Sequence, residues 1–158
     1  LSKKLNMSLK NLSAIKIPKI LKEKLSNKYI IRLYNKFEKE FGINENFAVA
    51  VSGGPDSLAL AFLTKIYSIK YRLNCNFFIV DHKLRKESSK EANKTKKILS
   101  DLSIQSKILT WNGKKPLKNI QSLARKKRYN LLFSKCKQFK INNLVLGHHL
   151  DDVQEQGY

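Results

Sequence analysis

The sequence predicts an α/β fold in which a parallel β-sheet lies between two layers of helices, a three-layer and doubly wound arrangement. Short apolar runs alternate along the chain with longer segments whose apolar residues recur at helical spacing. Such alternation is typical of strand–helix–strand units, whose strands run parallel. Polar residues follow three of the apolar runs directly, as ligand-binding residues do in such sheets.

The expected elements follow one another without an internal repeat or a Gly/Ser linker. The apolar pattern predicts a first helix over residues 30–41, which Gly42 ends as a C-terminal cap. Four buried strands are expected at 47–51, 76–81, 104–111 and 144–147. Three further helices are expected between them, at 57–71, 88–102 and 120–139.

A basic leader is expected before this domain. The first acidic residue is Glu23, and lysines alternate with Ser and Leu ahead of it. We therefore divide the chain into a leader, residues 1–25, and one domain, residues 26–158. An organellar presequence would favour arginine, and the first arginine is Arg32, so a leader that contacts RNA or stays solvated is the better interpretation.

The charge balance favours a polyanionic partner. The chain has 32 Lys+Arg against 12 Asp+Glu, a formal net charge of +20. Such a field attracts nucleic acid or an acidic membrane surface. Biased composition explains the preference for lysine over arginine, but it does not explain the shortage of acids. No apolar run approaches the ~18–20 residues that a membrane span needs. Of the two partners we expect the nucleic acid and not the membrane.

The two cysteines indicate a reducing compartment. Cys75 and Cys136 lie far apart and form no CxxC pair with metal-ligand spacing. A structural zinc site, an iron–sulfur cluster and a disulfide framework are therefore disfavoured. We expect a cytoplasmic location, with an organellar matrix as the alternative.

A phosphate-binding loop is predicted where the first strand meets its helix, in the segment Ser52-Gly53-Gly54-Pro55-Asp56-Ser57. Two glycines let the backbone approach an anion, and free amides at a helix start bind phosphate. Ser52 and Ser57 add hydroxyl donors, and Asp56 is a candidate ligand for Mg²⁺. The alternative is an ordinary strand-to-helix turn, but the strand before and the helix after favour the phosphate site.

Three candidate site residues lie at or just after the end of the second predicted strand. Asp81 ends that strand, where a carboxylate binds a sugar hydroxyl or a metal, or caps a loop. His82 is a minor candidate, since a satisfied turn residue is the commoner role. Arg85 is a candidate to neutralise a leaving phosphate, and a solvated charge is its alternative role.

Two further groups of charged residues flank the fourth strand. Arg125 and Arg128 are three residues apart, so they share a helix face from which guanidinium groups contact phosphates or a base edge. Asp151 and Asp152 are expected at a helix start, where carboxylates also act as caps. Asp152 and Glu155 lie one turn apart and can hold Mg²⁺ or an incoming ammonium group.

The phosphate loop resembles the SGGxDS signature of the PP-loop ATP-pyrophosphatases, which have an adenine nucleotide alpha hydrolase-like fold. That family cleaves ATP between its α and β phosphates, adenylates an oxygen, and lets a nucleophile displace AMP. Three other segments are similar to motifs of the tRNA(Ile)-lysidine synthetases. They are residues 80–85 with Ser88 and Glu91-Ala92 (VDHxLR…S…EA), residues 124–129 (ARxxRY), and residues 146–152 with Glu155 (GHHxDDxxE).

The resemblance covers roughly residues 46–156 and implies one reaction. Mg·ATP adenylates the C2 oxygen of the wobble cytidine in a CAU-anticodon isoleucine tRNA, and the ε-amine of free L-lysine then attacks C2. The products are lysidine, AMP and pyrophosphate. The resemblance implies these roles: ATP binding by residues 52–57, Asp81 and His82; catalysis by Asp56, Arg85 and Asp152; lysine binding by Asp152 and Glu155; tRNA binding by Arg125 and Arg128; Mg²⁺ binding by Asp56 and Asp151.

One departure from the family pattern leaves alternatives open. The family usually follows its aspartates with Gln-x-Glu-Thr, whereas this chain has Val153-Gln154-Glu155-Gln156 and ends at Tyr158. We therefore expect a domain incomplete at its C-terminal end, with a homodimer or a second chain completing the fold. The rival functions are a tRNA thiolase of the same superfamily, using Cys75 or Cys136, and a non-catalytic basic RNA-binding fragment.

Overall fold

The computed structural model describes residues 16–114 and 117–147. Its elements are α2 (Lys19–Leu25), α3 (Lys28–Phe41), β1 (Phe47–Val51), α4 (Pro55–Lys70), β2 (Cys75–Asp81), α5 (Ser88–Asp101), β3 (Lys107–Thr110), α6 (Ile120–Gln138) and β4 (Asn143–Gly147). None of the described helices is long and apolar enough to cross a membrane.

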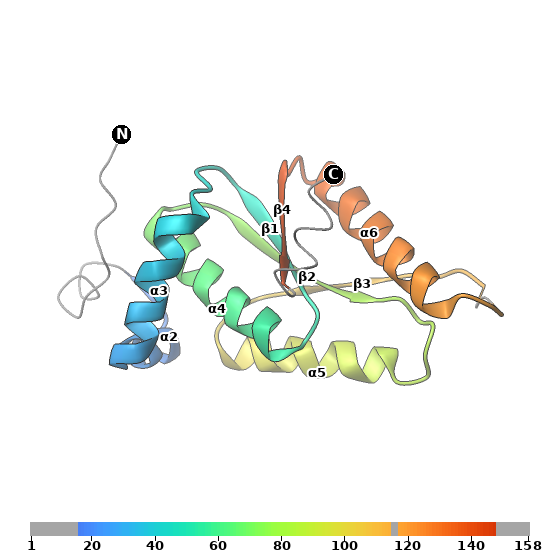
Figure 1. The fold of residues 1–158 in the computed structure, drawn as a ribbon, viewed down its shortest axis with the longest axis horizontal. Helices are drawn as coiled ribbons and strands as arrows, with labels where there is room; N and C mark the ends of the chain where they lie inside the picture. The colour runs from blue at the N-terminus through green and yellow to red at the C-terminus, as the bar shows by residue number, and fades with distance from the viewer. Residues whose placement is uncertain (1–15, 115–116, 148–158) are drawn as a thin grey trace.

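The described strands form one parallel sheet in the order β3-β2-β1-β4. Val49 of β1 pairs with Phe77 of β2 on one side and with Val145 of β4 on the other. The chain therefore winds outward from β1 to β3 and then returns to the far side of β1. Figure 1 shows α4 and α5 on one side of β2 and β3, and α6 on the other. The predicted three-layer, doubly wound α/β fold is confirmed.

Strand β1 is buried on both faces, which is why its sequence is apolar throughout. Successive side chains of a strand point to opposite faces. Phe47, Val49 and Val51 accordingly pack in the core that α3, α4 and α5 cover, whereas Ala48 packs against Leu132 and Cys136 of α6. The sheet thus separates two cores, and α6 covers only one of them.

Strand β3 is shorter than the sequence predicts, because Ile104, the first residue expected in it, instead bonds back to the C-terminal turn of helix α5. The N–H of Ile104 donates to the carbonyl of Leu99 at 2.8 Å, and Ser103 adopts a left-handed conformation with φ of 59°. This bonding is typical of a helix C-terminus. The Ile104 side chain is buried, so its apolar character serves the core rather than a strand.

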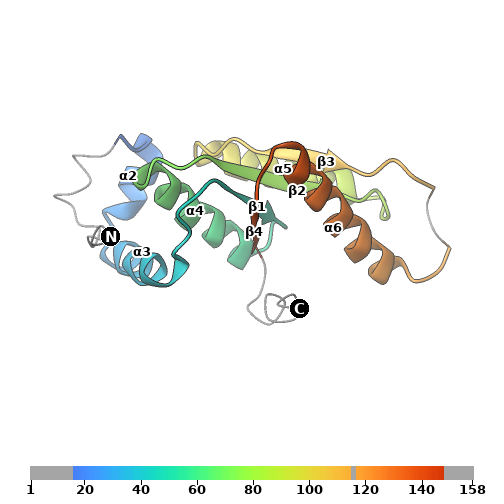
Figure 2. The same ribbon diagram turned by 90° about the horizontal axis from the view of Figure 1, so that it is seen from above.

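Part of the expected leader belongs to the core. Residues 19–25 form α2, whose Leu21 and Leu25 are fully buried and pack with the side chains around α3 and α4. Residues four apart share one face of a helix, so two leucines suffice to anchor a segment that is otherwise rich in lysine. Figures 1 and 2 both show α2 and α3 at one end of the molecule and α6 towards the other.

A buried ion pair joins α3 to α4. The Lys70 ammonium lies 2.6 Å from the Glu38 carboxylate, with side chains only 13% and 2% exposed. The Tyr34 hydroxyl donates to the same carboxylate at 3.1 Å. Burial raises the pKa of Tyr34, and the neighbouring Glu38 raises it further. The carboxylate thus depends on its partners for the solvation that water would otherwise supply.

We expect Lys70→Met to lower the free energy of unfolding by about 3 kcal/mol, because it leaves the Glu38 carboxylate buried without its cation. Urea unfolding followed by circular dichroism measures this loss. The double variant Lys70→Met/Glu38→Leu should recover much of it. The control is Lys97→Met in the exposed Lys97–Asp101 pair of α5, which should cost less than about 1 kcal/mol. Equal losses for Lys70→Met and Lys97→Met would contradict the prediction.

Candidate functional site

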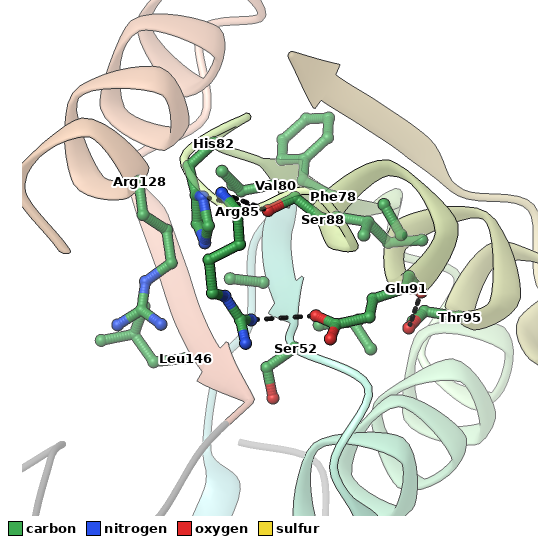
Figure 3. A pocket seen from close by; sticks show the side chains of 14 residues that line it. Ser52, Phe78, Val80, His82, Arg85, Ser88, Glu91, Thr95, Arg128 and Leu146 are labelled. Atoms are coloured by element: carbon green, nitrogen blue, oxygen red, sulfur yellow. Dashed lines mark hydrogen bonds and ion pairs between the residues drawn. The ribbon is translucent and has the colours of Figure 1, made fainter. Parts of the chain in front are cut away.

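A cavity of about 200 Å³ opens at the carboxyl ends of β1, β2 and β4. It lies where the chain reverses its direction across the sheet, between β1 and β4, the usual ligand position in doubly wound folds. Apolar residues of the strands form part of its wall. Figure 3 shows the polar and charged side chains that converge on it, which include Ser52, His82, Arg85, Glu91 and Arg128.

The loop after β1 packs tightly against α5. Gly53 has φ of +95°, and a Cβ at this position would lie 2.5 Å from the Thr95 hydroxyl oxygen. Only glycine suits both the conformation and the space. Within the loop, the Ser52 N–H donates to the Ser57 hydroxyl oxygen at 2.7 Å, and the Gly54 N–H lies 3.5 Å from the Ser52 hydroxyl oxygen. The loop is therefore closed by its own side chains.

The residues after Gly54 begin α4. Pro55 is the first residue of the helix, where its missing N–H costs nothing. Ser57 is buried, whereas Asp56 is exposed on the first turn and does not line the cavity. Within the described residues no group of three or more His, Cys, Asp and Glu side chains gathers to hold a metal ion. A single carboxylate beside a phosphate site still fits Mg²⁺, which usually combines one or two carboxylates with substrate phosphates.

Asp81 shapes the loop between β2 and α5. Its carboxylate is buried and accepts hydrogen bonds from the Lys83 N–H at 3.1 Å and from the Ser89 hydroxyl at 2.6 Å. Lys83 has φ of +57°, a conformation that costs a residue with a side chain about 1 kcal/mol or more. The structure thus gives Asp81 a loop-capping contact, and it does not place this carboxylate among the cavity-lining residues.

His82 lines the cavity as a half-buried side chain. Its Nδ1 accepts a hydrogen bond from the Leu84 N–H at 3.1 Å and lies 3.4 Å from the Ser88 hydroxyl oxygen. Burial lowers the pKa of His82, and the Arg85 cation lowers it further while Asp81 opposes this. The lowered pKa favours the neutral ring, and because Nδ1 accepts from Leu84 the proton of that form lies on Nε2.

Arg85 forms an ion pair with a residue that sequence reasoning did not select as a site residue. Its guanidinium lies 3.0 Å from the Glu91 carboxylate, and Figure 3 shows this pair beside Ser52. Both side chains are more than half exposed, so the pair is weak and open to exchange. The sequence signal that could have identified Glu91 is the spacing of Ser88, Glu91 and Thr95, which places all three on one face of α5.

Arg125 and Arg128 share an aromatic ring but line different spaces. Their guanidinium carbons lie 5.7 and 5.1 Å from the centre of the Tyr129 ring. Arg128 lines the cavity, where it lies opposite Arg85 in Figure 3. Arg125 instead lines a groove of about 500 Å³ between α6 and β4. The structure therefore places one of the two arginines in the cavity that Ser52 of the predicted phosphate loop also lines.

The remaining candidates are either outside the described residues or away from the cavity. Asp151, Asp152 and Glu155 lie outside the described residues, so their predicted roles in lysine and Mg²⁺ binding stay predictions. Burial raises the pKa of the thiol of both Cys75 and Cys136, which keeps them in the unreactive form. Neither cysteine lines the cavity.

Several curated relatives are similar in sequence to this chain over most of its length. It is 42% identical over 115 residues to a tRNA(Ile)-lysidine synthase of Orientia tsutsugamushi, which covers 73% of this chain and 26% of the relative. The corresponding enzyme of Rickettsia akari is 36% identical over 130 residues, covering 78% of this chain and 30% of the relative. The corresponding enzyme of Bartonella quintana is 42% identical over 109 residues, covering 68% of this chain and 23% of the relative. The chain thus spans less than a third of the length of these relatives.

A solved structure and a family model extend the comparison. The U34-tRNA thiolase NcsA from Methanococcus maripaludis, solved with its [4Fe-4S] cluster, aligns with a TM-score of 0.69 and 23% identity. The alignment covers 82% of this chain and 49% of that chain, and it shows a common fold. A family model described as a PP-loop domain matches residues 23–157. Its match includes residues 52–57, which we call the glycine loop, the residues that line the cavity, and every strand of the described sheet. The chain therefore belongs to the PP-loop domain family.

Proposed function

We propose that this chain is the nucleotide-binding part of a tRNA-modifying enzyme that joins lysine to the wobble cytidine of a CAU-anticodon isoleucine tRNA. The observation that carries the proposal is the cavity in which Ser52, Arg85 and Arg128 meet at the switch point of the sheet. A PP-loop domain implies ATP binding, and the tRNA(Ile)-lysidine synthases of three bacteria, 36–42% identical to this chain, support the substrate.

The cavity suits a nucleoside triphosphate such as ATP. The amides at the start of α4 and its positive dipole end favour an anion beside residues 52–57. Arg85, from the loop between β2 and α5, and Arg128, from helix α6, add two cations to the cavity. These cations would stabilise the charge that develops on a leaving pyrophosphate. Neutral His82 offers a hydrogen-bond donor without adding charge. Asp56 is the described residue that would hold Mg²⁺, an ion that screens phosphate charge and orients the triphosphate.

The proposed reaction has two steps. The C2 oxygen of the cytidine attacks the α-phosphorus of ATP, the bond to the β-phosphate oxygen breaks, and pyrophosphate leaves. The ε-amine of lysine then attacks C2 and loses a proton, and the C2–oxygen bond breaks to release AMP. The target base lies in an RNA loop, where proteins can turn a base outward and bind its edges. Asp152 and Glu155 are the proposed contacts for the lysine.

A tRNA thiolase is the second candidate, because the solved thiolase has the same fold. A thiolase needs a sulfur carrier at the cavity, either a reactive cysteine or a cluster held by cysteines. Burial keeps the pKa of both thiols high, and the cavity contains neither of them. Lysine transfer therefore has the stronger support.

The direct test is transfer of labelled lysine from solution to a CAU-anticodon isoleucine tRNA in the presence of Mg·ATP. The expected product is lysine-labelled tRNA with one AMP and one pyrophosphate released per lysine. Asp56→Ala should abolish the labelling, because it removes the proposed Mg²⁺ ligand. Transfer of sulfur instead of lysine would favour the thiolase, and RNA binding without ATP binding would favour the non-catalytic fragment.

The glycine loop gives a sharper prediction for ATP binding. Gly53→Ala should weaken Mg·ATP binding by at least about tenfold, because the new Cβ would collide with Thr95 in a conformation that alanine disfavours. Isothermal titration calorimetry measures the change. Gly42→Ala is the matched control, since Gly42 has φ of +63° but no atom within 4 Å of an added Cβ. It should lower stability by about 1 kcal/mol and leave ATP binding unchanged.

The Arg85–Glu91 pair predicts two changes of opposite sign in pyrophosphate affinity. Arg85→Gln should weaken pyrophosphate binding by about tenfold, because a charge-assisted contact is lost. Glu91→Gln should strengthen it by up to about fivefold, since Arg85 no longer has to leave an exposed ion pair worth ~0.2–1 kcal/mol. Competition with a fluorescent ATP analogue measures both. Weaker binding in both variants would show that the intact pair, rather than Arg85 alone, forms the site.

A further inference from the structure

The cations of this chain are distributed unevenly between its two helical layers. From Leu102 to Gly147 the sequence has nine lysines and two arginines but no aspartate or glutamate. This stretch comprises β3, α6 and β4. Among the described residues, the ion pairs either join α3 to α4 or lie between β2 and the end of α5. The α6 layer therefore presents positive charge that no carboxylate of its own sequence offsets.

Three lysines of this layer are held by aromatic rings on the side of α6 that faces β3. The Lys127 ammonium lies 3.3 Å from the centre of the Trp111 ring. The ammonium groups of Lys107 and Lys135 lie 5.6 and 5.5 Å from the centre of the Phe139 ring. We name Lys107, Lys127 and Lys135 the lysine flank. A ring face attracts a cation without neutralising its charge, so the ammonium groups are oriented yet remain available to an anion.

The rings themselves are fixed by packing. Phe139 lies 6.0 Å from Phe78 of β2, between ring centres. Trp111 follows β3, its N–H donates to the carbonyl of Asp81 at 3.0 Å, and its ring covers the backbone of Gly113. Because the side chains are partly ordered in advance, an anion that binds the flank loses less conformational entropy.

The flank extends from the cavity along α6. Lys127 is the neighbour of the cavity residue Arg128, and Lys135 lies eight residues further along the helix than Lys127, about 12 Å at 1.5 Å per residue. A nucleic-acid strand carries a phosphate about every 3.4 Å of its axis, so this length matches about three phosphates. β3 is an edge of the described sheet, which leaves this side of α6 without a further strand (Figure 1).

We infer that the lysine flank binds the sugar–phosphate backbone of the RNA whose target nucleotide enters the cavity beside Arg128. This inference rests on the proposed RNA substrate and adds a second, sequence-independent contact surface to it. Phosphate contacts fix the position of a nucleic acid without reading its bases.

The test measures binding of a fluorescent RNA hairpin to the chain by anisotropy at several salt concentrations, without ATP or lysine. The variant Lys107→Gln/Lys127→Gln/Lys135→Gln should bind about tenfold or more weakly. The slope of a plot of the logarithm of its binding constant against the logarithm of the salt concentration should be smaller in magnitude by about 2 to 3. The reason is that about one counterion is released per phosphate contact. The loss should be the same for a CAU loop and for a changed loop on the same stem.

A matched control separates the flank from net charge. The variant Lys36→Gln/Lys94→Gln/Lys96→Gln removes the same charge from exposed lysines of α3 and α5, in the other helical layer. It should keep most of the RNA affinity, and both variants should keep the thermal unfolding midpoint and Mg·ATP binding of the unchanged chain.

A variant that keeps the charge tests the role of the ring. Trp111→Leu should weaken RNA binding by about threefold, since it releases Lys127 from its ring. Equal losses in the two triple variants, no loss in the flank variant, or binding to anionic vesicles in place of RNA would overturn the inference. ATP binding is measured separately, so these RNA-binding results test the flank and not the nucleotide site. A chain that binds RNA through the flank but does not bind ATP would count against the proposed function and not against the flank.

Discussion

The contact between the glycine loop and helix α5 is the constraint on which the rest of the site depends. Gly53 brings the backbone so close to Thr95 that no side chain fits between them. This contact fixes the start of α4 beside the first turns of α5, and thereby places Ser52 next to the Arg85–Glu91 pair. Ser52 after β1 and Arg85 after β2 share one cavity only because this approach is allowed.

The sheet explains why Arg128, the second cation, reaches the same cavity. Parallel strands end at one edge, and the reversal of strand order between β1 and β4 leaves space there that no crossover helix fills. Helix α6 crosses the opposite face of the sheet from α5, so Arg128 approaches the cavity from the other layer. The site thus lies between a layer that contains carboxylates and a layer whose sequence has none, which would give the proposed RNA substrate one favourable side of approach.

The sequence predicted the fold well because the two central strands, β1 and β2, are buried on both faces and the helices mainly on one. Continuous apolar runs and helical spacing are then both visible, and β1 was predicted at its observed bounds, Phe47–Val51. Helix α2 was missed because only Leu21 and Leu25 mark it among lysines. The third strand was predicted too long because Ile104 is apolar for a reason other than strand formation.

The candidate site was predictable in its position but less so in the roles of its residues. Ser52, His82, Arg85 and Arg128 line one cavity, as the convergence of strand ends implied. The capping contacts of Asp81 depend on Ser89 and on the left-handed backbone at Lys83, which no sequence pattern revealed. The partner of Arg85 and the separation of Arg125 from Arg128 likewise arise from tertiary packing.

The measurement that tests the central claim most directly is the change in backbone amide chemical shifts when Mg·ATP is added to the isotope-labelled chain. The largest changes should appear at Gly53 and Gly54, and further changes around Arg85 and Arg128, from three separate elements that meet at one cavity. Helices α2 and α3, at the other end of the molecule, should be unaffected (Figure 2). Changes confined to those helices, or none at the glycine loop, would contradict the placement of the nucleotide at the switch point of the sheet.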